Sequence, residues 1–226
     1  MKLAMVALLW MPLVMASSST EDARDRQDRA TLEASVKSLS EAARKSPQDA
    51  GAQYRSALVR SYLAEVALQL GDKAGARAAA EAGIQDAERA VALQGNSAEH
   101  HRILGTLCGQ VIPANVMLAL KYGKCASDSV NRALELDPKS SDAYLSRGVG
   151  NYYLPPAFGG GVELAIRDFR EAIRLNPKSA DAYLWLGIAV RKAGRNEEAR
   201  TALKKSLELN PNRLWAKQQL EKTPAK

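Results

Sequence analysis

The chain has 226 residues, of which 46% are hydrophobic, 25% charged and 5% aromatic. This composition is typical of a helical protein rich in Ala and Leu, and it excludes disordered, collagen-like and membrane-bundle chains. Two Cys and two adjacent His are too few for a structural zinc site without carboxylates. The formal net charge is +7, with most of the excess in residues 191–226. We interpret that excess as a solvated helix face, and not as a surface for nucleic acid or membrane.

The first 16 residues have the pattern of a secretory signal peptide. Lys2 supplies one positive charge, an apolar stretch runs from Leu3 to Met15, and Ala16 offers a small residue for cleavage. The stretch is shorter than the roughly 20 residues that cross a bilayer, and Pro12 interrupts it. We expect cleavage after Ala16, an exported chain that is periplasmic or secreted, and no later membrane segment. An uncleaved anchor or a misplaced start codon is the alternative.

A repeat organises the rest of the chain. Helical patterns end at Pro138, Pro177 and Pro211, each preceded by Leu-Asp or Leu-Asn. The last interval is 34 residues long and has large, small and helix-ending residues at tetratricopeptide (TPR) spacing: Tyr183, Leu186, Gly187, Ala199, Leu203 and Pro211. Gly187 and Ala199 are expected to be small because the two helices of the repeat cross closely there.

Less regular copies of this pattern precede the last one. We predict repeats over residues 97–139, 140–178 and 179–212, with extra residues between the two helices of the first two. A degenerate repeat is predicted over 48–96, a leading amphipathic helix over 21–46, and a capping helix over 212–222. Residues 17–226 should therefore form one all-α domain of about ten helices without strands, a right-handed superhelix of antiparallel helix pairs.

The chain thus resembles TPR proteins over nearly all of its length after the signal peptide. The resemblance implies a binding scaffold with a protein or peptide partner, no enzymatic activity and no cofactor. The Pro-Pro-Ala-Phe-Gly-Gly loop at residues 155–160 is also similar to loops of two TPR subfamilies: exported components associated with TRAP-type solute transporters, and the regulator of microtubule dynamics type. Sequence motifs of nucleotide-binding, metalloprotease or nucleophile-elbow sites are absent.

Two functional hypotheses follow from the resemblance. The first is an exported adaptor that binds a protein or peptide in its concave groove; the second is an accessory protein of a solute transporter that binds a small molecule or lipid. The groove is predicted from helix positions that line such superhelices: Arg102, Thr106, Leu145, Val149, Tyr152, Leu184, Ile188 and Arg191. Its apolar members should be only partly buried and open to a partner, unless the insertions of the chain itself cover them.

Three smaller features leave alternatives open. Tyr153, Pro155, Pro156 and Phe158 belong to a loop that either closes one end of the groove as a lid or packs over the repeat core. Cys108 and Cys125 fall in one repeat and form either a disulfide or two buried thiols. His101 is expected at a packing position and His100 in solvent. We predict no catalytic residue and no metal site.

Overall fold

The computed structural model describes residues 20–225, where the chain forms eleven α-helices and no strand. The predicted all-α fold is confirmed for this part of the chain. The predicted signal peptide, residues 1–16, lies outside the described residues. A short helix over residues 20–25 comes first. The following helices are α2 Arg29–Lys45, α3 Ala50–Gln69, α4 Lys73–Leu93, α5 Ala98–Val111, α6 Ala119–Leu136, α7 Ser141–Tyr153, α8 Val162–Leu175, α9 Ala180–Lys192, α10 Asn196–Leu209 and α11 Leu214–Glu221.

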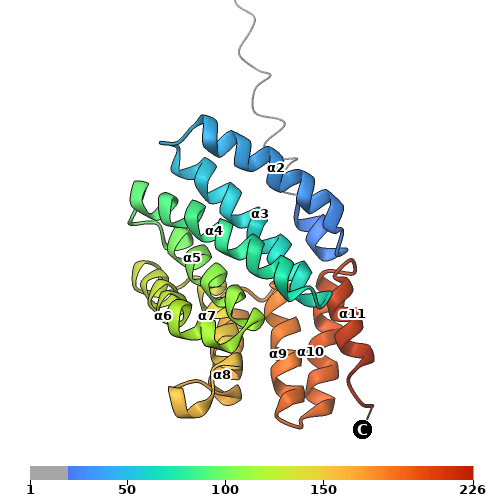
Figure 1. Cartoon of the computed structure of the whole chain (residues 1–226). Helices are drawn as coiled ribbons and strands as arrows, with labels where there is room; N and C mark the ends of the chain where they lie inside the picture. Colours follow the sequence, from blue (N-terminus) through green and yellow to red (C-terminus); the bar gives the residue numbers. More distant parts are fainter. Residues whose placement is uncertain (1–19, 226) are drawn as a thin grey trace, which may run out of the picture.

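The helices pack as antiparallel pairs, α3 with α4, α5 with α6, α7 with α8 and α9 with α10 (Figure 1). The first helices of successive pairs, α3, α5, α7 and α9, also touch one another, while α2 packs on α3 and α11 on α10. Each first helix begins at a side-chain cap, in which an oxygen of Asp49, Ser97, Ser140 or Ser179 accepts the backbone N–H three residues later. Such a cap stabilises a helix by about 1 kcal/mol.

Small residues allow the helices of a pair to approach closely. A Cβ added to Gly187 in α9 would lie 2.6 Å from Cγ of Leu203 in α10 and 3.1 Å from the carbonyl oxygen of Ala199. Gly148 in α7 is held in the same way against the ring of Phe169 in α8. The close crossing expected at Gly187 and Ala199 is therefore confirmed.

The extra residues of the irregular repeats are used in three different ways. The degenerate repeat has longer helices, with 20 residues in α3 and 21 in α4 against 13 in α9 and 14 in α10. The next repeat inserts two short 3-10 turns, η1 Ile112–Ala114 and η2 Val116–Leu118. The third inserts the loop with the 3-10 turn η3 Pro156–Phe158.

The N-terminal segment differs from the prediction of one leading helix over 21–46. The helix breaks after residue 25, and Gln27 takes a backbone φ of 56° before α2 begins at Arg29. The break turns residues 20–27 away from α2 and towards the last repeat. The two ends of the superhelix meet there, and Figure 1 draws them side by side in blue and red. The side-chain Nε2 of Gln27 donates to Oε1 of Gln218 in α11 at 3.2 Å.

Candidate functional site

The end of the predicted groove formed by α5 is filled by a polar network of the chain itself. Arg102 donates from Nε to a carboxylate oxygen of Glu99 at 2.7 Å, and Tyr54 in α3 donates from its hydroxyl to the other oxygen at 2.8 Å. Thr106 is hydrogen-bonded to Ser146 in α7, with 3.2 Å between the hydroxyl oxygens. Arg102 and Thr106 are therefore engaged in contacts between α3, α5 and α7.

A second charged group joins the two ends of the superhelix. We call it the closure cluster: Arg24, Asp25, Glu65, Asp181 and Arg213. Arg213, directly before α11, is 1% exposed; it bonds Asp181 at 2.9 Å, and its guanidinium also pairs with Glu65 in α3. Arg24 reaches Asp181 at 3.0 Å. Burial alone would raise the pKa of the Asp181 carboxyl, but Arg24 and Arg213 outweigh it and lower the pKa to about 2.

Helix α11 covers the groove face of the last repeat. Leu184 and Ile188 are 0% and 4% exposed and pack with Leu203 and Ala216, so the expectation that they line an open groove is wrong. The reason is that α11 occupies the place where the first helix of a further repeat would lie. Arg191 is also engaged, because it donates to the carbonyl of Gln219 at 3.1 Å and to its side-chain oxygen at 2.7 Å.

The remaining groove residues, Leu145, Val149 and Tyr152, are half-buried. They adjoin a row of aromatic rings that crosses from α7 to α11. Tyr152 lies 5.0 Å from Tyr153 and 5.9 Å from Trp185 in α9, and Trp185 lies 5.1 Å from Trp215 in α11, all measured between ring centroids. Trp185 and Trp215 were not among the site residues predicted from the sequence. The signal was their rarity, since only 5% of the chain is aromatic.

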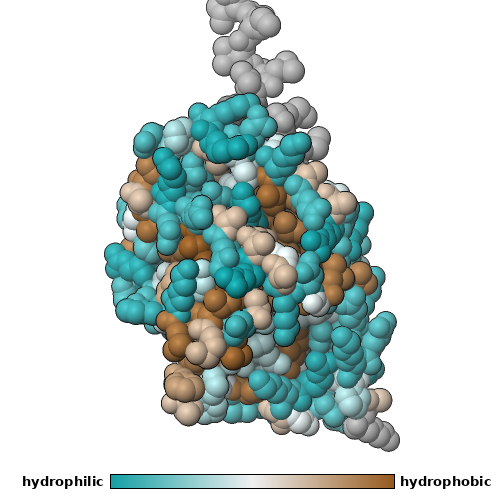
Figure 2. All heavy atoms as spheres, viewed as in Figure 1, coloured by the Kyte–Doolittle hydropathy of each residue, from teal (hydrophilic) through white to brown (hydrophobic). Residues whose placement is uncertain are grey.

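An open cleft of about 590 Å³ lies at the exposed end of this row. It is lined by the end of α7, the loop and the start of α8: Tyr152, Tyr153, Leu154, Pro155, Pro156, Gly160, Gly161, Val162, Glu163 and Leu164, with Lys192 from α9. Phe158 and Tyr153 are 75% and 62% exposed, so they do not pack over the repeat core. Figure 2 shows apolar atoms gathered at the lower left, where Figure 1 draws α7 and the turn before α8.

Lys192 gives the cleft its cationic side. Its ammonium group lies 4.2 Å from the centroid of the Tyr152 ring and donates to the Tyr152 carbonyl at 3.2 Å. A cation held on an aromatic face leaves its remaining N–H groups available to an acceptor. The cleft thus combines flat aromatic faces, rigid prolines, the positive charge of Lys192 and the carboxylate of Glu163, which pairs with Arg195 at 3.3 Å.

Comparison with known proteins gives a consistent result. Residues 158–213 match the family model of the tetratricopeptide repeat. These residues are a tetratricopeptide repeat, and the described chain has the fold of TPR proteins. A thermophilic TPR protein of Thermus thermophilus, TTC0263, has a similar fold, with 19% identity, a TM-score of 0.66 and coverage of 93% of this chain and 96% of that one. The HusA haemophore of Porphyromonas gingivalis has 18% identity, a TM-score of 0.63 and coverage of 83% and 96%. At this identity the likenesses show the fold. The search of curated proteins finds no match.

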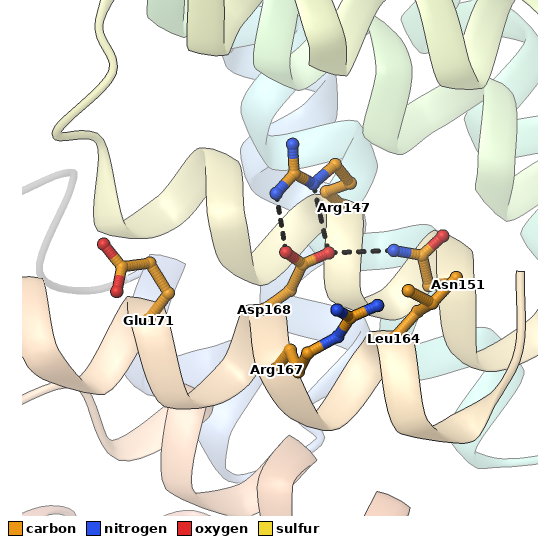
Figure 3. Close-up of a pocket in the computed structure, with 6 residues that line it drawn as sticks. All are labelled: Arg147, Asn151, Leu164, Arg167, Asp168 and Glu171. Atoms are coloured by element: carbon orange, nitrogen blue, oxygen red, sulfur yellow. Dashed lines mark hydrogen bonds and ion pairs between the residues drawn. The ribbon is translucent and has the colours of Figure 1, made fainter.

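A second hollow of about 390 Å³, drawn in Figure 3, lies between the two helices of the third TPR. Asp168 in α8 points into it and accepts two bonds from Arg147, at 2.7 and 3.1 Å, and one from Asn151 at 2.8 Å. The carboxylate is 9% exposed and its bonding capacity is largely used. This hollow therefore holds an internal brace of the α7–α8 pair.

Two cysteines of the second TPR are joined. Cys108 in α5 and Cys125 in α6 form a disulfide, with their Cα atoms 6.0 Å apart. The structure thereby decides between the bonded pair and two buried thiols. The expectation for His100 is wrong: it is 6% exposed, and its ring stacks on Tyr54 at 5.4 Å. His100 is buried because Tyr54, near the start of α3, packs against its ring.

Residues 20–225 hold neither a metal-binding cluster nor a membrane-spanning helix. No group of three or more His, Cys, Asp or Glu side chains in this range is placed to hold a metal ion. None of the helices in this range is long and apolar enough to span a bilayer. Within residues 20–225, the aromatic cleft and the exposed insertions are open to a partner.

Proposed function

We propose that this TPR protein is a binding scaffold that acts outside the cytoplasm and holds an extended polypeptide segment in the cleft beside Tyr152. The observation that carries the proposal is the exposure of Tyr153 at that cleft and of Phe158 in the loop that lines it, while the predicted groove is filled by the chain itself at its α5 and α9 ends. Exposed apolar side chains gathered around a concave site are typical of partner surfaces.

The chemistry of the cleft favours an apolar or proline-containing segment with an acceptor group. Tyrosine faces supply large contact areas at low cost in side-chain entropy, and Pro155 and Pro156 hold the opposite side rigid. Lys192 provides a donor and a positive charge for a carboxylate or a backbone carbonyl of the ligand. In a segment that bears an acidic residue next to an apolar one, the apolar side chain would pack on the tyrosine rings and the carboxylate would bind Lys192.

Export is part of the proposal and is supported by two observations. The apolar stretch that ends at Met15 has the length and flanks of a secretory signal. The bond between Cys108 and Cys125 belongs to a class that forms and persists mainly in oxidising compartments. Intact-mass measurement of the native protein tests this part, with a chain that starts at Ser17 and contains the oxidised pair as the expected result. A reduced chain that retains Met1 in the cytoplasmic fraction would contradict it.

Peptide selection tests the binding site. A random-peptide phage library is panned on the oxidised chain, and the affinity of the best peptide is measured by calorimetry. The double variant Tyr153→Ser/Phe158→Ser should weaken this peptide at least tenfold, because truncated aromatic anchors are the usual hot spots. The double variant Val116→Ser/Leu120→Ser, which changes two exposed apolar residues near the start of α6, is the matched control and should bind as wild type.

The fluorescence of Trp185 reports whether the peptide occupies the cleft. Its ring contacts both Tyr152 and Tyr153, so a bound peptide should change its emission, and Trp185→Phe should remove the change. Haemin is the small-molecule probe, since a protein of this fold is named as a haemophore. If haemin bound stoichiometrically and no peptide were selected, the scaffold hypothesis would be wrong and the small-molecule hypothesis would take its place.

A further inference from the structure

The insertion between the two cysteines carries the most exposed apolar residues that the structure describes. We call residues 109–124 the stapled insertion, because Cys108 and Cys125 are bonded at its base. Val116, Met117 and Leu120 are 78%, 62% and 82% exposed. Scattered single apolar residues are normal on a protein surface, whereas three within five positions of one projection form a patch that needs an explanation.

The projection is built into the fold. Ile112, before the tip, and Leu118, between Met117 and Leu120, turn inwards and pack against the core cluster of the α3–α6 region, and η1 packs on α4. The side chain of Asn115 accepts the backbone N–H of Met117 at 3.0 Å and so fixes the turn between η1 and η2. Tyr122 donates from its hydroxyl to Glu81 in α4 at 3.0 Å and fixes the start of α6. The inward residues anchor the insertion while the apolar tip points outwards.

Basic side chains lie close to this tip. Lys121 and Lys124 belong to the stapled insertion, and Arg77 in α4 pairs with Glu81, the residue that Tyr122 contacts; all three basic side chains are exposed. The neighbouring carboxylates are already paired, since Glu81 bonds Arg77 at 3.1 Å and Asp128 pairs with Lys124. Arg77 and Lys124 are thus matched by these two carboxylates, and Lys121, whose ammonium group lies 4.8 Å from the centroid of the Tyr122 ring, adds a positive charge beside the apolar tip.

We propose that the stapled insertion docks on a membrane surface with anionic lipid headgroups. The interface of a bilayer accepts apolar side chains to a depth of about 5–10 Å, and it holds lysines at headgroup level, where their stems lie along the acyl boundary. Each basic residue near such a surface adds attraction that falls off within about one Debye length. A convex tip with aliphatic ends and a basic rim fits this interface, whereas the concave cleft beside Tyr152 fits a polypeptide. The proposal does not depend on that cleft.

Vesicle flotation of the oxidised full chain tests the proposal. Vesicles of phosphatidylcholine with phosphatidylglycerol should carry the protein to the top of the gradient, vesicles of phosphatidylcholine alone should carry much less, and added salt should weaken the first result. The double variant Val116→Ser/Leu120→Ser should lower the partition coefficient at least tenfold. Lys121→Glu should reduce binding to the anionic vesicles alone. Both variants change exposed side chains, and unchanged thermal melts verify that they fold.

The matched control is Tyr153→Ser/Phe158→Ser, which removes two equally exposed apolar side chains from the other insertion and should float as wild type. Wild-type protein that stays at the bottom with both vesicle types overturns the proposal. It is also overturned if the Val116/Leu120 variant floats unchanged or if the control loses binding to the same extent. If the protein bound no vesicles but bound a protein partner in a way that required Leu120, the tip would be a polypeptide-binding surface and the membrane proposal would be overturned. The Tyr153/Phe158 variant is the test in the peptide assay and the control in the vesicle assay, and the Val116/Leu120 variant has the opposite use. Failure of one proposal is therefore distinguishable from failure of the other.

Discussion

Two glycines in α7, one turn from the loop, should respond in opposite ways to the same substitution. Gly148→Ala is expected to destabilise the protein, and Gly150→Ala to stabilise it. A Cβ at Gly148 would lie 2.5 and 2.7 Å from two ring carbons of Phe169, whereas at Gly150 it would meet no atom within 4 Å. Both residues are helical, so the change in backbone preference is similar and the contacts decide the sign.

The magnitudes follow from two opposing contributions. Alanine in place of glycine inside a helix stabilises by about 0.5–1 kcal/mol, because the unfolded chain loses freedom and the helix gains propensity. Overpacking a filled core costs about 1–3 kcal/mol. The Phe169 ring has little room to move, since it is 0% exposed and stacks on Trp185 at 6.1 Å. We therefore expect a net loss of about 1–2 kcal/mol for Gly148→Ala and a gain of up to about 1 kcal/mol for Gly150→Ala.

Urea denaturation followed by far-UV circular dichroism measures both free energies of unfolding. Equal slopes with urea concentration for the wild type and both variants would show that the comparison is sound. For a chain of this size each kcal/mol moves the melting temperature by about 2–4 °C, so a difference of about 1–3 kcal/mol should separate the two melting temperatures by about 2–12 °C. If Gly148→Ala were as stable as Gly150→Ala, the close crossing of α7 and α8 at Phe169 would be refuted.

Three further outcomes are expected. Reducing the disulfide between Cys108 and Cys125, which are 17 positions apart, should lower the free energy of unfolding by about 3 kcal/mol in urea titrations. Acid should weaken the closure cluster: the pKa of Asp181 is about 2 in the folded chain and about 3.9 when unfolded, so its contribution of about 2 kcal/mol is complete above about pH 5 and is lost as the pH falls towards 2. Asp181→Asn should flatten this part of the pH–stability curve. Arg191→Ala should speed amide hydrogen exchange in α11, because Arg191 bonds the carbonyl of Gln219.

The repeat could be predicted from sequence because its determining residues act locally. Gly187 and Ala199 must be small where two adjacent helices cross, and Pro211 must follow the end of a helix. Such requirements recur in each repeat, so the same residue types return at regular intervals in the sequence. The added residues of the degenerate repeat carry no comparable trace. They extend α3 and α4 by whole turns, which preserves helical periodicity and gives no sequence signal for a loop.

The closure cluster could not be predicted for a different reason. Its contacts join residues 148 positions apart in sequence, as between Glu65 and Arg213, and each partner is an ordinary charged residue. No periodicity links them. Only the turn at Gln27 brings Arg24 and Asp25 to the last repeat. Gln rarely adopts the left-handed conformation, so its presence at this position does not predict a turn. The closure of the superhelix at this end could therefore not be predicted from the sequence.

Val149 and Ile188 show how the end of a repeat array changes the meaning of a position. Both occupy the same place in the first helix of a TPR, yet Val149 is half-buried beside α9 and Ile188 is 4% exposed beneath α11. Ile188→Glu should therefore cost several kcal/mol and loosen α11, because an unpaired carboxylate would be buried there, while Val149→Glu should cost less since its carboxylate can reach water. Thermal melts with hydrogen exchange in α11 measure the difference. Equal losses, or intact protection of α11 in the Ile188 variant, would mean that α11 does not seal the last repeat and that the groove remains open at its end.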